Sequence, residues 1–125
     1  NYAISHAPDE VKAYLICAPV WDMSMLEDKG FDLIFSSGML EHITSDKLNK
    51  SIEEMTRLGK RGLIGVACKD DPTTKDKADT THEIILTQKE WQDLFPTEFK
   101  IISDSQDSWF KELYNSFLAL FGVKE

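Results

Sequence analysis

Short apolar runs alternate with amphipathic stretches along this chain of 125 residues. Residues 14–20, 31–36 and 62–68 are such runs, and residues 99–103 alternate apolar and polar side chains, so each predicts a β-strand. The run at 31–36 is almost continuously apolar, which predicts burial on both faces, as in a parallel sheet. Strands that alternate with helices indicate an α/β fold, in which helices cross over a sheet.

Helical spacing and capping residues predict the helices between these strands. Residues 8–13 are expected to end a short helix. A longer helix is expected to begin with Ser45 as its N-cap and to end at Gly59. Its apolar positions recur on one face, at Leu48, Ile52, Met55 and Leu58. Thr87 and Glu90 have the spacing of a capping box, which predicts the start of a further helix.

Two segments are less regular. Residues 69–81 are polar and charged and predict a loop. Residues 109–123 are rich in aromatic and aliphatic side chains, and their pattern allows either a helix or a buried strand. No repeat or linker divides the chain, so we expect residues 1–125 to form a single domain.

The composition and net charge of the chain argue against some classes of binding partner. Hydrophobic residues make up 42% of the chain and charged residues 29%, as expected for a packed globular domain. Lys and Arg number 14 and Asp and Glu number 22, which gives a formal net charge of −8. This acidic balance argues against a nucleic-acid partner, because phosphate binding requires clustered cations. No apolar run approaches the roughly 20 residues of a membrane-spanning helix, so no membrane partner is expected.

The cysteines and histidines suggest neither a disulfide nor a metal centre. Cys17 and Cys68 lie inside apolar runs without a C-x-x-C pattern, which predicts reduced core residues and a cytoplasmic location. The three histidines are scattered along the sequence and have no zinc-type spacing. The sequence therefore predicts no metal site.

The segment from Phe31 to Ile43, FDLIFSSGMLEHI, carries the most specific resemblance. Together with the helix that follows it, the run at 58–66 and the segment at 81–91, it resembles the class I S-adenosylmethionine-dependent methyltransferases of the small-molecule type. The resemblance extends from about residue 14 to residue 103. It implies a partial Rossmann-like sheet, mostly parallel with an antiparallel C-terminal strand and with helices on both faces. It also implies methyl transfer from S-adenosylmethionine to a small-molecule substrate.

The resemblance assigns candidate cofactor-binding residues. Asp22 would accept a hydrogen bond from the adenine amino group, although an ordinary turn aspartate is the alternative. Trp21 and Met23 would flank the purine. In a parallel sheet, ligands bind beyond the carboxyl ends of the strands, and three small residues follow the strand at 31–36 closely enough to admit a ligand to the backbone: Ser36, Ser37 and Gly38.

Glu41, His42 and His82 are the candidates for the chemistry near the methyl acceptor. Methyl transfer is an in-line displacement, and a hydroxyl or amine acceptor can require a general base. His42 can supply that base, because histidine titrates near neutral pH; the alternative is that it packs against the turn. Glu41 is expected to be structural or to contact a ligand. His82 either lines the acceptor pocket or lies on the surface.

The sequence also departs from the family pattern. It contains no G-x-G-x-x-G cluster, so we expect a fold that starts after the family's second strand and binds the cofactor weakly or not at all. The strand at 31–36 would then expose an apolar edge, which is a known site of pairing with other chains. We expect this edge to be covered, either by residues 14–20 or by a second copy of the chain in a homodimer.

Two other classes of function remain open at this stage. A non-catalytic methyltransferase-like module that mediates dimerisation or a partner interaction is favoured by the exposed edge. A nucleotide-binding or response-regulator-like domain would require an acidic cluster at the first strand end, which the sequence does not show. Ser36 and Ser37 lack the G-x-S-x-G context of a hydrolase nucleophile.

Overall fold

The computed structural model describes residues 2–71, 81–104, 111, 115–116 and 118–119. Its elements, in chain order, are α1 (Tyr2–Ser5), α2 (Asp9–Lys12), β1 (Ile34–Ser37), the 3-10 helix η1 (Leu40–His42), α3 (Ser45–Leu58), β2 (Gly62–Val66), α4 (Gln88–Asp93) and β3 (Phe99–Ser103). The α/β class is confirmed, and both long predicted helices form close to their expected bounds.

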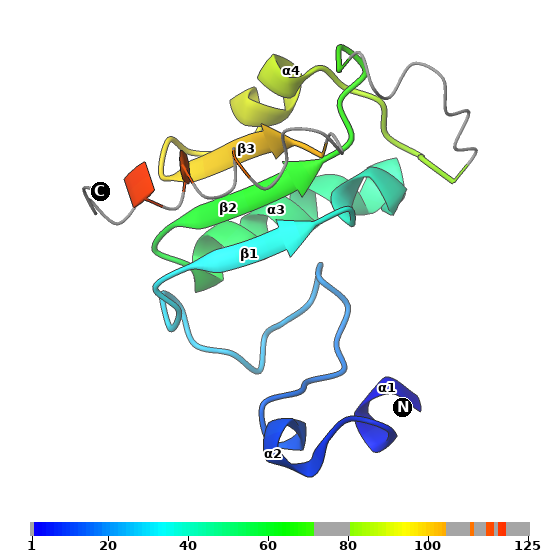
Figure 1. Cartoon of the computed structure of the whole chain (residues 1–125), viewed down its shortest axis with the longest axis vertical. Coiled ribbons are helices and arrows are strands. Elements are labelled where there is room, and N and C mark those ends of the chain that lie inside the picture. The colour runs from blue at the N-terminus through cyan, green and yellow to red at the C-terminus, as the bar shows by residue number, and fades with distance from the viewer. Residues whose placement is uncertain (1, 72–80, 105–110, 112–114, 117, 120–125) are drawn as a thin grey trace.

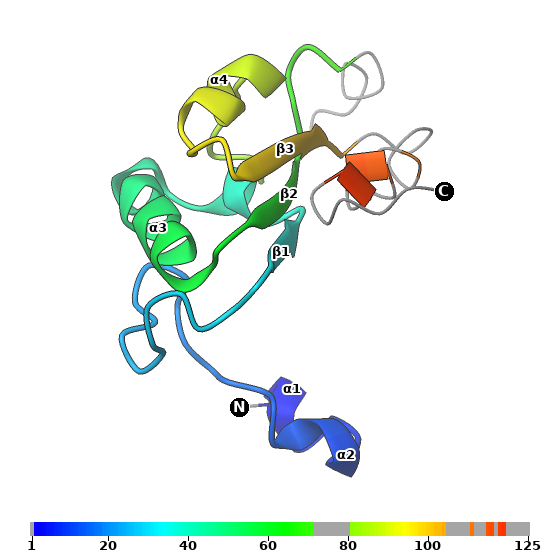
Figure 2. The same ribbon diagram turned by 90° about the vertical axis from the view of Figure 1, so that its left-hand side faces the viewer.

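The three strands form one parallel sheet in the order β1-β2-β3 (Figure 1). Ile34 is paired with Gly62, and Gly62 in turn with Phe99. Each connection between neighbouring strands carries a helix that covers the same face of the sheet, first α3 and then α4 (Figure 2). The parallel pairing of β1 with β2 through one crossover helix is therefore confirmed.

The prediction of an antiparallel C-terminal strand was wrong, because every strand in the described part of the chain is parallel. Most of residues 109–123, whose pattern allowed either a helix or a buried strand, lie outside the described residues. The tail residues that are described, 111, 115–116 and 118–119, are helical, and they lie on the face of the sheet opposite α3 and α4 (Figure 2). None of the helices in the described ranges is long and apolar enough to cross a membrane.

The amphipathic pattern of α3 builds the core beneath the sheet. The four apolar positions predicted to share one face are all buried: Leu48, Ile52, Met55 and Leu58. The first three belong to one cluster with side chains from β2, β3 and α4, including Ile64, Trp91 and Phe99. The helix begins one residue earlier than predicted, because Thr44 occupies the N-cap position and Ser45, the predicted cap, is already helical.

Strand β2 is the central strand, and all five of its residues are buried. Burial on both faces therefore belongs to β2 and not to β1, for which it was predicted. Gly62 allows close packing between β2 and its neighbour β3. A Cβ atom at this position would lie 1.9 Å from Cδ1 of Phe99, so the phenyl ring occupies the space that a side chain would need.

Helix α4 covers the outer edge of β3 with two glutamine side chains. The predicted capping box of Thr87 and Glu90 is present and fixes the start of the helix. Gln92 donates to the carbonyl of Phe99 at 2.7 Å and accepts from the amide of Ile101 at 3.0 Å, and Gln88 donates to the carbonyl of Ile101 at 3.1 Å. Backbone groups on this edge are thus satisfied within the chain.

No described residue pairs with the outer edge of β1, and the strand predicted at 14–20 does not form. This prediction was wrong. The segment has an apolar composition, and Val20 at its end packs against the core. Tyr14 and Ile16 are nevertheless exposed, and so is Cys17, which was expected in the core. Phe35 on β1 is 53% exposed. Helices α1 and α2 also lie apart from the sheet and bury no residue (Figure 1).

Candidate functional site at the carboxyl edge of the sheet

The carboxyl ends of the three strands bring several candidate residues to one edge. Ser36 and Ser37 end β1, and Gly38 follows with its amide donating to the carbonyl of Gly65 at 3.1 Å. The backbone of Gly38 has a φ of 62°, a left-handed conformation that glycine adopts without strain. This turn redirects the chain into η1, which carries Glu41 and His42.

Glu41 is buried at this edge, with only 2% of its surface exposed. Its Oε1 atom accepts a hydrogen bond from the amide of Ala67, directly after β2, at 3.2 Å. Its backbone carbonyl accepts from the amides of Glu83 and Ile84 at 2.8 and 3.1 Å. Oε2 is also buried, and no hydrogen-bond donor reaches it from the described residues. Glu41 therefore ties three segments together while leaving one carboxylate oxygen unsatisfied.

His42 lies beside Glu41 but is exposed. Its Nδ1 atom is 3.1 Å from the carbonyl oxygen of Thr81 and 3.1 Å from the hydroxyl of the same residue. Donation from Nδ1 to the carbonyl would leave the lone pair on Nε2. The ring of His42 meets that of His82 edge to face, with centroids 4.8 Å apart. The structure thus brings together all three residues singled out for chemistry.

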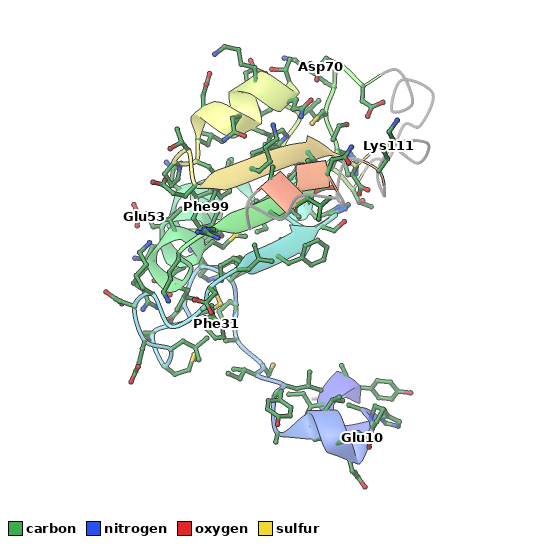
Figure 3. The ribbon with its side chains drawn as sticks, turned by 60° about the vertical axis from the view of Figure 1, so that its left-hand side comes forward. Glu10, Phe31, Glu53, Asp70, Phe99 and Lys111 are labelled. Carbon is green, nitrogen blue, oxygen red and sulfur yellow. The ribbon has the colours of Figure 1, made fainter. Side chains whose placement is uncertain are left out.

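Acidic side chains surround this edge. Burial, and then the nearby carboxylates Asp70, Asp71 and Glu41, raise the pKa of the Cys68 thiol to about 11, against the opposing effect of a hydrogen bond with Ser103. The thiol is therefore protonated at neutral pH and is a poor nucleophile. Asp70 lies beyond the end of β2 (Figure 3). The field at this edge favours a cationic ligand.

The segment at 21–23 lies beside α3 and not at the carboxyl edge. The amide of Met23 donates to Glu54 at 2.7 Å and its carbonyl accepts from Arg57 at 3.0 Å, both in the C-terminal half of the helix. Glu54 lies nine residues beyond the start of α3, or roughly 13 Å along its axis. Trp21 precedes this anchor and is half-buried. The Asp22 carboxylate accepts from the amide of Ser24 at 3.4 Å, the contact of an ordinary turn aspartate.

The Glu54–Arg57 pair that anchors this segment was not predicted from the sequence. Arg57 donates to Glu54 through Nε at 2.8 Å, and it also binds Asp28 at 2.7 Å. Hydrogen bonds from Arg57, and then from the amide of Met23, lower the pKa of Glu54 to about 2. The spacing of Glu54 and Arg57 on one helix face was the available signal, but their partners at 23–28 depend on a loop path that the pattern does not encode.

Asp104 is a second residue that the sequence analysis missed. Its amide donates to the carbonyl of Val66 at 2.8 Å, and its carboxylate lies 3.4 Å from the position of a Cβ atom at Gly38. Its place directly after the strand at 99–103 was the signal that could have identified it. A surface pocket of about 380 Å³ lies elsewhere, against Thr97 and Lys100 and tail residues of the opposite face.

Comparison with known proteins gives one match. The model of a family described as a methyltransferase domain matches residues 2–66, slightly more than half of the chain. The matched region runs from α1 to the end of β2 and includes Asp22, Ser36–Gly38, Glu41 and His42. No curated protein and no solved structure matches the chain.

Proposed function

Because this chain belongs to the methyltransferase domain family, we propose that it takes part in methyl transfer from S-adenosylmethionine to a small-molecule acceptor. The observation that carries the proposal is the β1-α3-β2 unit inside the matched region, with Glu41 and His42 at its carboxyl edge. This edge is where open α/β sheets bind their ligands.

The edge fits the charged part of the cofactor. S-adenosylmethionine carries a sulfonium, which makes its methyl group an electrophile. Ser36 to Gly38 offer a turn of small residues at which a ligand can approach the backbone, and Asp104 adds a carboxylate 3.4 Å from the Cβ position of Gly38. The acidic surroundings favour a cation at this place. The adenine contacts proposed for Asp22, Trp21 and Met23 would require that segment to move from α3.

His42 is the proposed general base. With Nδ1 directed at Thr81, a proton on Nδ1 leaves the lone pair of the exposed Nε2 able to accept a proton from an acceptor hydroxyl or amine. Glu41 then has a positioning role, because its buried contacts with Ala67, Glu83 and Ile84 hold η1 against β2 and the segment that carries His82. His82 would line the acceptor side.

Titration with S-adenosylhomocysteine, followed by backbone amide NMR of the full chain, tests this proposal. We expect weak binding, because the sequence contains no G-x-G-x-x-G cluster to hold the cofactor. The Kd should be on the order of 1 mM, which corresponds to a binding free energy of roughly −4 kcal/mol. At millimolar ligand, the amide signals of Ser36, Gly38 and His42 should shift, whereas ADP at the same concentration should leave them in place. The absence of shifts at all three positions, or equal shifts with ADP, would contradict a cofactor site at this edge.

A non-catalytic interaction module is the second candidate, and the two edges of the sheet favour it. The β3 edge is satisfied by Gln88 and Gln92, whereas β1 leaves its outer edge open and Phe35 exposed. An open apolar strand is a template for a strand of another chain. In this alternative, β1 pairs with β1 of a second copy and forms a homodimer with a continuous sheet.

A further inference from the structure

Glu41, His42 and His82 form a three-residue cluster whose composition suits a transition metal. One possible ligand atom from each side chain lies within 4.8 Å of those of the other two. The spacing of 1 and 40 positions between these residues gave no metal signal in the sequence. Two segments create the cluster: η1 carries the first two residues, and the segment leading to α4 carries the third.

We propose that this cluster binds a divalent transition metal ion of the zinc class. Two imidazoles and one carboxylate are the donor set of many zinc sites with three protein ligands. Imidazole favours zinc, cobalt and nickel over magnesium and calcium, which prefer oxygen ligands only. The inference does not depend on methyl transfer.

The buried carboxylate of Glu41 is the independent observation that points to a cation. One oxygen is engaged by Ala67, while Oε2 is buried without a donor from any described residue. A buried carboxylate oxygen left unsatisfied costs the free energy of its lost hydration. A cation bound at Oε2 would remove this penalty, whereas a purely structural glutamate has no evident reason to retain it.

The contacts of His42 match those of a metal-binding histidine. Such residues usually donate from the ring nitrogen that does not bind the metal to a carbonyl or carboxylate, which fixes the tautomer and the ring orientation. Here Nδ1 lies 3.1 Å from the carbonyl oxygen of Thr81, so Nε2 is the atom that would bind the ion. An ion on Nε2 occupies the lone pair that a general base would use, so His42 performs only one of these two roles at a time. The hydrogen bonds from Glu83 and Ile84 to the Glu41 carbonyl hold the His82 segment beside this ring.

The geometry requires only a small closure. Two ligand atoms of a tetrahedral zinc ion lie roughly 3.4 Å apart, because each bond is about 2.1 Å long. Separations of up to 4.8 Å therefore close by rotation of exposed or half-buried imidazoles, while the buried Glu41 stays in place. Because His42 is exposed, an ion can enter from solvent and keep a water molecule as its fourth ligand.

Cobalt(II) titration of the metal-free full chain, read by visible absorption and followed by competition with zinc, tests the proposal. We expect one cobalt ion per chain, displaced by one equivalent of zinc. His82→Ala should weaken cobalt binding at least tenfold, since even loss of an outer partner of a ligand weakens such sites by about 10- to 100-fold. His6→Ala is the matched control, because the side chain of His6 contacts Tyr2 and Ser5 of α1, and α1 lies apart from the sheet (Figure 1).

The readout separates this proposal from methyl transfer, because no cofactor is added. His82 is half-buried, so His82→Ala should fold, and an unchanged far-ultraviolet circular dichroism spectrum would confirm that it does. His42→Ala should weaken binding to a similar extent. Failure of the wild-type chain to bind cobalt, or equal affinity in wild type and His82→Ala, would overturn the proposal. Equal weakening by His6→Ala would place the ion elsewhere and would also overturn it.

Discussion

Replacement of Glu54 by glutamine should destabilise the domain by about 2–3 kcal/mol at neutral pH. Glu54 is almost fully buried on α3, where it accepts from the amide of Met23 at 2.7 Å and from two nitrogens of Arg57 at 2.8 and 3.0 Å. Its pKa falls from 4.5 to about 2 in the folded state. Since one pKa unit corresponds to about 1.4 kcal/mol, the ionised carboxylate stabilises the fold by up to about 3 kcal/mol. Glutamine keeps the shape but not the charge.

The direction of the pH dependence follows from the lowered pKa. The unfolded chain takes up the proton at Glu54 near pH 4.5, before the folded chain does at about pH 2. The contribution is therefore complete above the unfolded pKa and is lost as the pH falls through the folded pKa. The difference in the free energy of unfolding between wild type and Glu54→Gln should shrink from about 3 kcal/mol at pH 7 to about 1.4 kcal/mol at pH 3.

Urea unfolding followed by circular dichroism at pH 7, 5, 4 and 3 measures this difference. Glu53→Gln is the matched control, because Glu53 is the adjacent glutamate on the exposed side of α3 (Figure 3) and meets Lys50 only at 3.5 Å. An exposed pair of this kind contributes between about 0 and 1 kcal/mol. Equal losses in the two variants, or a difference for Glu54→Gln that does not change between pH 7 and pH 3, would refute the proposed anchoring of residues 23–28.

Two further predictions concern the sheet. Gly62→Ala should lower the free energy of unfolding in urea by about 1–3 kcal/mol, because its Cβ would lie 1.9 Å from the buried ring of Phe99. Gly30→Ala is the control and should lower it less, because its Cβ would come no closer than 3.2 Å to Glu27. A larger loss of stability in Gly30→Ala than in Gly62→Ala would contradict the packing of Gly62 against Phe99. If β1 pairs with a second copy, sedimentation analysis should show a concentration-dependent dimer that Phe35→Lys disrupts. A wild-type chain that stays monomeric at every accessible concentration would rule out the dimer.

The local pattern of apolar and polar residues correctly predicted the helices and strands whose apolar faces pack against each other. The helical spacing of Leu48 to Leu58 predicted α3, the capping-box spacing of Thr87 and Glu90 predicted the start of α4, and the short apolar run at 62–68 predicted the strand that forms at 62–66. These signals are local because a helix or strand needs one face of the right period, and capping involves residues three positions apart. The α/β class follows from their alternation.

The same local pattern failed at residues 14–20. Their composition suits a strand, but a strand also requires a hydrogen-bonded neighbour, and the tertiary structure provides none for this segment. The apolar run at 31–36 likewise predicted burial on both faces, which β1 does not show, because burial depends on what lies beside a strand and not on its own residues.

At the candidate site, too, the sequence predicted some features and the tertiary structure decided the others. The sequence by itself determined that Glu41 and His42 follow a strand end, and therefore that they lie at the carboxyl edge of the sheet. Only the tertiary structure decided that His82 joins them, that one Glu41 oxygen is buried without a donor, and that Met23 is held on α3 by Glu54. Proximity between residues far apart in the chain is set by the packing of whole elements, which the order of the side chains does not reveal.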